Sequence, residues 1–350
     1  MREDAWSEIR IGDLGEVFTG RTPPTERPAY FGDDYPFITP GDMRQGKYAR
    51  ATQRSVSHEG AELLKRIKVP ANSVCVSCIG WQMGEAIMTD KPSFTNQQIN
   101  TIVPNGKVEP SFLYYSLRPR KQELLSLGAT TGVRTPILNK SAFCDLKVNI
   151  PPLPVQRRIA GIMSAYDELI ENSQRRIRIL EAMARTLYRE WFVHFRFPGH
   201  EKIPRVASPL GEIPQGWTVK KLGELTAYLN RGLSPSYDEN GDSTIINQKC
   251  IRDERLALEP ARRQTKPIPP DKFVRFGDVL INSTGVGTLG RVAQVYQNLD
   301  ECTVDTHVTI ARSNLDTDLD FFGCTLLRHQ ETFERLGLAA RGRSPIFTKR

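Results

Sequence analysis

The chain has 350 residues, of which 25% are charged and 39% hydrophobic, and its formal net charge is +8. No apolar run is long enough to span a bilayer and the start of the chain is polar, so we expect neither a membrane span nor a signal peptide. The six cysteines then suggest a cytoplasmic protein with free thiols. The length permits two domains with cores of their own, and the positive charge favours a polyanion as partner.

The first 150 residues predict a mostly β domain that contains two misleading motifs. GDMRQGK at 41–47 resembles a phosphate-binding loop, but Tyr48 stands where that loop needs a hydroxyl for magnesium. Cys75 and Cys78 form a C-x-x-C motif without a second pair or a nearby histidine. In a strand their thiols point to opposite faces, so we expect buried core cysteines and no metal site.

A long helix is predicted from about residue 155 to 192, after the proline-rich start PPLPVQRRIA at 151–160. Apolar residues recur in it at spacings of three and four over about five heptads, interrupted at Ser173. Such a helix spans roughly 55 Å, and its apolar stripe needs a partner. The stripe consists of Ile159, Ile162, Tyr166, Leu169, Ile177, Leu180, Met183 and Leu187.

The rest of the chain repeats the beginning. After a segment at 196–214 that we predict to be a linker, residues 217–225 match residues 6–14 at an offset of 211. Other matches keep the same order, including Gly277–Asn282 with Asn72–Ser77 and Arg343 with Arg134. This pattern indicates a diverged tandem duplication of one domain.

A formal G-x-G-x-x-G at Gly285, Gly287 and Gly290 suggests a dinucleotide site. The first copy has lost the middle glycine, which lets the backbone approach a pyrophosphate. The residues after Gly290 alternate as in a strand, so no helix N-terminus is available for an anion. We therefore expect a strand, a glycine turn and a second strand.

The expected fold is α+β: two repeated domains, mostly β with a highly twisted sheet and short helices, separated by a long coiled-coil-type helix. The predicted boundaries are 1–150 for the first domain, 151–195 for the helix, 196–214 for the linker and 215–350 for the second domain. Two basic domains separated by a long helix suggest that the protein binds duplex DNA at two places.

The chain resembles the specificity subunit of type I restriction-modification enzymes. The resemblance rests on IPPLPVQRRIA at 150–160, IPQGWTVKKLG at 213–223, YPFITPGD at 35–42 and TTGVRTPI at 130–137. It implies a non-catalytic DNA reader in which each target-recognition domain binds half of a bipartite site and the helix sets the gap. It also implies methyltransferase subunits docked on the helix, and restriction/translocase subunits that join them. No cofactor is expected in this chain, because S-adenosylmethionine, ATP and magnesium belong to those partners.

One departure concerns the second copy, which reaches residue 350 opposite residue 141 of the first. We therefore expect a second domain that is incomplete at its C-terminus. The stripe would then pair with another copy of the chain, with a separate fragment or with a methyltransferase.

Polar loop residues are the candidates for DNA contact, because base edges and phosphates are read by such side chains. They are Arg21, Lys47, Arg54, Trp81, Asn96, Gln97, Gln98 and Arg134 in the first copy, and Arg231, Lys249, Arg252, Asn282, Thr284, Arg291 and Arg343 in the second. Two alternatives stay open: a helix-mediated scaffold that touches no DNA, and a nucleotide-dependent enzyme.

Overall fold

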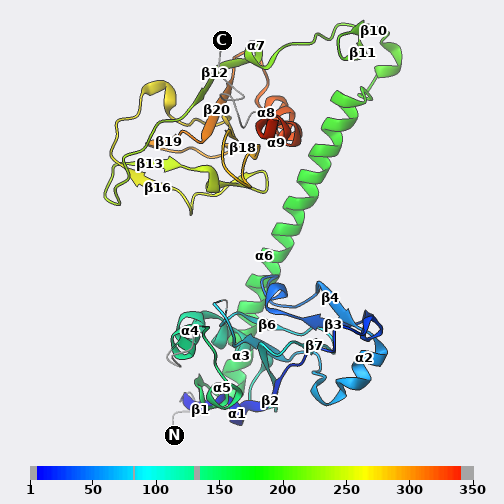
Figure 1. The fold of residues 1–350 in the computed structure, drawn as a ribbon, viewed down its shortest axis with the longest axis vertical. Coiled ribbons are helices and arrows are strands. Elements are labelled where there is room, and N and C mark those ends of the chain that lie inside the picture. The colour runs from blue at the N-terminus through cyan, green and yellow to red at the C-terminus, as the bar shows by residue number, and fades with distance from the viewer. Residues whose placement is uncertain (1–5, 82, 130–134, 340–350) are drawn as a thin grey trace. The chain divides into compact units, whose positions relative to one another are not determined.

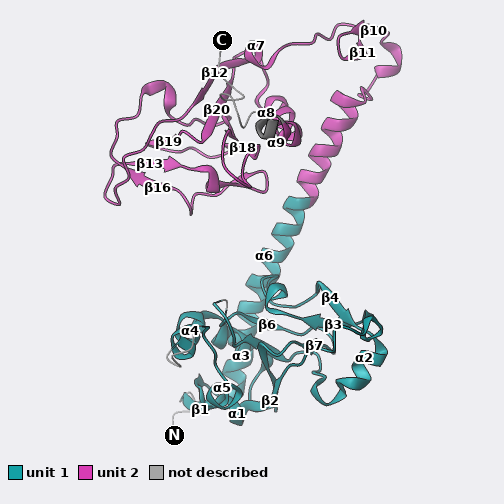
Figure 2. Ribbon diagram, in the orientation of Figure 1, with its two compact units in different colours: residues 1–178 teal, residues 179–350 magenta. Residues whose placement is uncertain are grey.

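The computed structural model describes residues 6–81, 83–129 and 135–339, with side chains described up to residue 335. The chain divides into two compact units, residues 1–178 and 179–350 (Figure 2). Both units combine short strands with helices, so the fold is α+β, as predicted (Figure 1).

Unit 1 is built on two small sheets. A four-stranded sheet has the order β2 (Gly15–Thr19), β8 (Ile99–Pro104), β5 (Val74–Ser77), β6 (Ala86–Met88). A three-stranded sheet has the order β4 (Arg54–Val56), β3 (Phe31–Ile38), β7 (Phe94–Thr95), with β3 and β7 parallel. The helices are α1 (Ile11–Leu14), α2 (His58–Leu63), α3 (Pro110–Leu117), α4 (Lys121–Ala129) and α5 (Lys140–Asp145). Strand β9 (Lys147–Ile150) pairs with β1 (Ser7–Arg10) and so closes the unit ahead of the long helix.

Unit 2 contains the same two sheets. The four-stranded sheet has the order β12 (Thr226–Arg231), β20 (Val308–Ser313), β17 (Val279–Asn282), β18 (Val292–Gln294). The three-stranded sheet has the order β16 (Arg262–Gln264), β13 (Ser243–Ile246), β19 (Cys302–Val304), again with one parallel pair, β13 and β19. A small hairpin joins β14 (Ile251–Arg252) and β15 (Arg255–Leu256), and the helices are α7 (Leu222–Leu225), α8 (Leu319–Arg328) and α9 (Gln330–Ala339).

The strand orders confirm the duplication. In unit 1, Val74 pairs with Met88 on one side and with Ile102 on the other. In unit 2, the matching Val279 pairs with Gln294 and with Ala311. Because the matching valines pair with the corresponding strands on both sides, the two copies share one fold despite their divergence.

The glycine motif of unit 2 lies between two antiparallel strands, β17 and β18. The prediction of strand, turn and strand is confirmed, and a strand follows Gly290 where a dinucleotide site needs a helix. The G-x-G-x-x-G string therefore has no structural context for a nucleotide.

The two cysteines of the C-x-x-C motif point into different cores, as predicted. Cys75 packs in a cluster with Ile38, Met43 and Ile87, whereas Cys78 belongs to the main core of unit 1. Burial raises the pKa of both thiols to about 12. They are therefore neutral core side chains at physiological pH.

The raised pKa of Cys75 predicts a loss of stability in alkali. In the unfolded chain the thiol ionises near its ordinary pKa of 9.0, whereas in the folded chain it stays neutral up to about pH 12. The contribution of the neutral thiol to the free energy of unfolding is thus fully present below pH 9 and is lost as the pH rises toward 12. Urea unfolding between pH 7 and 11 should show a shallower decline for Cys75→Ala than for the wild type. Equal slopes would contradict the linkage.

The long helix α6 (Leu153–Tyr188) is one continuous helix, followed by a π-helical turn at Arg189–Val193 (Figure 1). The predicted helix over 155–192 is thus confirmed, with a wider last turn. The division between the compact units falls inside α6, so each unit includes one part of the helix.

The predicted linker at 196–214 is more structured than expected. It contains a hairpin of β10 (Arg205–Ser208) and β11 (Gly211–Pro214), turned by Gly211 at φ 102°. The motif IPQGW then places Trp217 against the end of the long helix, stacked on Phe197 at 5.5 Å and beside Phe192 at 5.7 Å. Aromatic packing of this kind anchors the segment, which sequence polarity alone did not reveal.

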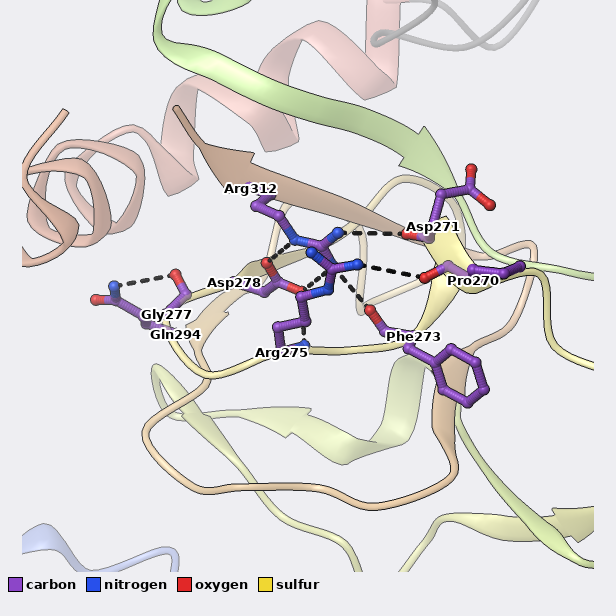
Figure 3. A network of polar contacts seen from close by, with 8 residues as sticks. All are labelled: Pro270, Asp271, Phe273, Arg275, Gly277, Asp278, Gln294 and Arg312. Atoms are coloured by element: carbon purple, nitrogen blue, oxygen red, sulfur yellow. Dashed lines mark hydrogen bonds and ion pairs between the residues drawn. The ribbon is translucent and has the colours of Figure 1, made fainter. Parts of the chain in front are cut away.

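A buried ion pair braces the sheet of unit 2 (Figure 3). Arg312 on β20 donates from Nε and Nη2 to the two carboxylate oxygens of Asp278, at 2.8 Å each. Arg312 also donates to the carbonyl of Phe273 at 2.7 Å, and Asp278 accepts from the backbone N–H of Arg275 at 2.8 Å. Asp278 is 1% exposed, so the pair links β20 to the loop before β17 inside the domain.

Candidate nucleic-acid interface

Most of the residues predicted to contact DNA lie at the surface. Arg21, Arg54, Trp81, Gln97, Lys249 and Arg252 are exposed, and Gln98, Arg231, Thr284 and Arg291 are half-buried. Arg134 and Arg343 lie outside the described residues.

Lys47 is a correction, because it is buried where the sequence predicted a surface cation. Its Nζ donates to Ser111 Oγ at 2.9 Å and to Ser164 Oγ on α6 at 2.7 Å. Burial lowers the pKa of the Lys47 ammonium, although Glu109 and Asp167 oppose this effect. Lys47 therefore links α6 to the rest of unit 1, and its side chain is not a surface cation.

Asn96 and Asn282 are also corrections, since both side chains are buried. Asn282 Nδ2 donates to the carbonyls of Gln248 and Thr288, at 2.9 and 3.0 Å, and so holds the glycine loop. Asn96 Oδ1 accepts from the backbone N–H of Gln98 at 3.1 Å and fixes a turn. Short polar side chains often bond nearby backbone in this way, which the sequence pattern could not distinguish from base contact.

Other predicted cations are held by neighbours. Arg54 lies over the Phe31 ring at 4.0 Å, and Arg291 Nη2 donates to the carbonyl of Gly287 at 2.9 Å. Arg262 was not among the predicted contacts. Its guanidinium lies over the Tyr237 ring, 3.6 Å from the ring centroid. Stacked arginines keep donors available while losing little conformational freedom on binding.

In each unit a polar turn precedes one strand of the four-stranded sheet, β8 in unit 1 and β20 in unit 2. Equivalent backbone hydrogen bonds hold the two turns. In unit 1 the turn is residues 96–98, where Cys78 N donates to Gln98 O at 2.7 Å and Gly20 N to Ile99 O at 3.1 Å. In unit 2 the turn is residues 305–307, where Ser283 N donates to His307 O at 2.9 Å and Gly232 N to Val308 O at 3.1 Å. His307 was not among the predicted contacts, and its equivalence with Gln98 follows from these backbone hydrogen bonds.

Gly232 is expected to be essential for the turn of unit 2, because a Cβ there would collide with the Val304 carbonyl. We expect Gly232→Ala to destabilise unit 2 by about 1–3 kcal/mol, the usual cost of overpacking. Gly161→Ala is the control, because nothing lies within 4 Å of its added Cβ and alanine favours a helix. The melting temperature should fall for Gly232→Ala and should not fall for Gly161→Ala. The opposite order would show that the close approach is unimportant.

The apolar stripe of α6 is exposed. Tyr166, Leu169, Leu180 and Met183 each expose about six tenths of their surface, and Ile162, Ile177 and Leu187 about half, whereas Ile159 packs partly against the core of unit 1. Within the described part of the chain, most of the stripe is therefore uncovered, and its pairing with a partner stays a prediction.

Each unit contacts its own part of α6 through residues outside the stripe. In unit 1, Gln156 and Ala160 are buried, and Asp167 accepts from the Tyr115 hydroxyl at 2.7 Å. In unit 2, Glu181 accepts from Arg255 at 2.7 Å and Arg185 donates to Glu254 at 3.0 Å. At 100° per residue these positions lie about 100–180° around the helix from Leu169 and Leu180, so these contacts leave the stripe open to a partner.

Neither a metal site nor a membrane span emerges from the described residues. They contain no group of three His, Cys, Asp or Glu side chains arranged to hold a metal. No helix among them is both long and apolar enough to cross a membrane.

Comparisons with known proteins agree with this architecture. The model of the type I restriction modification DNA specificity domain matches residues 3–182. The type I restriction enzyme MjaIX specificity subunit of Methanocaldococcus jannaschii is 28% identical over 334 residues, 92% of this chain and 76% of that protein. The HindI specificity subunit of Haemophilus influenzae is 34% identical over 181 residues, 50% of this chain and 39% of that protein. The crystal structure of an S subunit from M. genitalium aligns with a TM-score of 0.60 at 15% identity, covering 99% of this chain and 83% of that one, which bears on the fold alone.

Proposed function

Because the chain belongs to the family of the type I restriction modification DNA specificity domain, we propose that it reads a bipartite DNA site, one half with each unit. The chain is a specificity component of such a system and not its enzyme. Its relatives are named as specificity subunits. The observation that carries the proposal is the repeated fold: the same two sheets, with the same strand order, occur in both units. Two related domains that differ in their surface residues can each bind a different short sequence.

The charge of the chain supports DNA as the ligand. The net charge is +8, and the exposed cations among the proposed contacts include Arg21, Arg54, Lys249 and Arg252. Cations of this kind bind phosphates, and binding then weakens as salt displaces the protein. Arg134 and Arg343 remain proposed contacts from the sequence.

The exposed stripe of α6 supports docking of a methyltransferase. A row of apolar side chains over several helical turns is the type of surface that a partner helix covers. We propose that methyltransferase subunits bind there, that restriction/translocase subunits join them, and that these partners carry the S-adenosylmethionine, ATP and magnesium chemistry.

The test is to sequence the methylated adenines of cells with and without the gene. The proposal predicts a split motif with a gap of fixed length that disappears when the gene is deleted. An identical set of methylated sites in both strains would refute it.

A helix-mediated scaffold is the second candidate, and the exposed stripe favours it too. Mobility shifts of random duplex DNA at increasing salt separate the two candidates. A scaffold would self-associate and show no salt-dependent binding, whereas a reader binds duplex DNA and loses affinity as salt rises.

A further inference from the structure

We propose that each unit reads bases with one equivalent edge, made of a polar turn and an apolar loop tip. In unit 1 the edge consists of Gln97, Gln98 and Trp81, and in unit 2 of Thr306, His307 and Val286. The inference rests on the proposed DNA-reading function and deepens it, because it assigns the difference between the two half-sites to matched positions in the two copies.

The first observation is a constant backbone with different side chains. Hydrogen bonds from Gly20 and Cys78 hold the turn of unit 1, and hydrogen bonds from Gly232 and Ser283 hold that of unit 2. The buried first residue of each turn, Asn96 or Asp305, accepts from the N–H two positions later, at 3.1 and 2.8 Å. A rigid backbone that carries different polar residues can present different recognition chemistry in one geometry.

The outward side chains of the turn in unit 1 are oriented by neighbours. Gln97 Oε1 accepts from the Thr22 hydroxyl at 2.7 Å, and Gln98 Oε1 accepts from Asn96 Nδ2 at 3.0 Å. Since each amide oxygen is engaged, the amide nitrogen is the end that a base would meet. Its two hydrogens suit acceptors such as purine N7, guanine O6 or thymine O4.

The turn in unit 2 has different chemistry. His307 Nδ1 lies 2.5 Å from the Thr284 hydroxyl, which orients the ring and leaves Nε2 as its outer nitrogen. Thr306 is exposed and carries a hydroxyl that can donate or accept. A threonine–histidine pair and a glutamine–glutamine pair at matched positions should therefore prefer different bases.

The second observation is an apolar residue at the tip of the neighbouring loop. Trp81 is 70% exposed and Val286 is 91% exposed. Each follows a glycine with positive φ, Gly80 at 93° and Gly285 at 116°.

The two tips occupy the same place in the two copies. They are separated by 205 residues, the offset that also relates Asn72–Ser77 to Gly277–Asn282. Residues 78 and 283, where these loops begin, donate to the turns themselves. Tip and turn thus form one edge, where an apolar side chain can contact a thymine methyl or press against a base step.

The experiment exchanges the turn residues between copies in cells that carry the complete system, and sequences the methylated adenines. Gln97→Thr with Gln98→His should change one or two adjacent base pairs in one half of the motif, with a discrimination of roughly 5- to 150-fold, and leave the other half unchanged. Thr306→Gln with His307→Gln should change the other half alone. The control is Gln122→Ala, an exposed glutamine on α4, which should keep the wild-type motif.

The outcomes separate the inference from the proposed function. Wild-type cells without a split motif would overturn both. A wild-type motif that persists in both exchange variants would overturn the inference and leave the function standing.

A variant that methylates nothing is resolved with its purified complex on duplexes with and without the wild-type site. Retained salt-dependent binding without preference for the site supports the inference, and retained preference overturns it. If an exchange variant does not fold, Trp81→Ala decides for unit 1 and Val286→Ala for unit 2, because each only shortens an exposed side chain. Binding to the wild-type site should weaken roughly tenfold, and unchanged binding overturns the inference.

Discussion

Replacing Asp278 by alanine is expected to lower the free energy of unfolding of unit 2 by about 3–5 kcal/mol. The carboxylate accepts two hydrogen bonds from Arg312, whose side chain is only 15% exposed. Its removal leaves a guanidinium in the domain without its charge partner and also removes the acceptor for the Arg275 N–H. Urea unfolding monitored by tryptophan fluorescence measures the loss.

Two further variants identify the cause. Asp316→Ala, at an exposed aspartate of the same unit, should change stability by less than about 0.5 kcal/mol. The double variant Asp278→Leu with Arg312→Met should be more stable than Asp278→Ala, because no unpaired charge remains buried. A single variant as stable as the wild type would mean that the ion pair contributes little to the fold.

Aspartate substitutions in the stripe of α6 are expected to abolish methylation of the native sites. Leu169 belongs to unit 1 and Leu180 to unit 2, and each exposes about six tenths of its surface. If a partner covers them, each introduced carboxylate is buried in an apolar contact at a cost of about 3 kcal/mol or more. Such a cost weakens binding more than a hundredfold.

The matched control changes the other side of the same helix. Arg175→Asp introduces the same side chain at an exposed position about 120–140° around the helix and should leave methylation near the wild-type level. Leu169→Asp and Leu180→Asp should still fold, because the wild-type side chains are exposed in the chain itself. Wild-type methylation in these two variants would show that the methyltransferase docks elsewhere.

Local patterns in the sequence were sufficient for much of the architecture. The heptad spacing predicted α6 and its exposed stripe, because helix periodicity is a local property. The duplication predicted two copies of one domain. The lost middle glycine argued against a nucleotide site, and the alternation after Gly290 predicted a strand-turn-strand loop.

The individual site residues could not be predicted in the same way. The sequence predicts a surface cation at Lys47, yet its partners Ser111 and Ser164 are 64 and 117 residues away along the chain. The sequence predicts a base contact for Asn282, yet its amide holds a loop by hydrogen bonds to the carbonyls of Gln248 and Thr288. A polar side chain bonds whatever the fold brings near it, and residue type does not reveal that partner.

The sequence by itself determined the repeat, the long helix with its apolar stripe and the basic character of the chain, because each depends on residue order and composition. Only the tertiary structure decided which polar residues face outward, that equivalent backbone hydrogen bonds hold the two polar turns, and that Trp81 and Val286 are exposed. The physical reason is that burial and hydrogen-bond partners arise from contacts between residues distant along the chain, which no local pattern encodes.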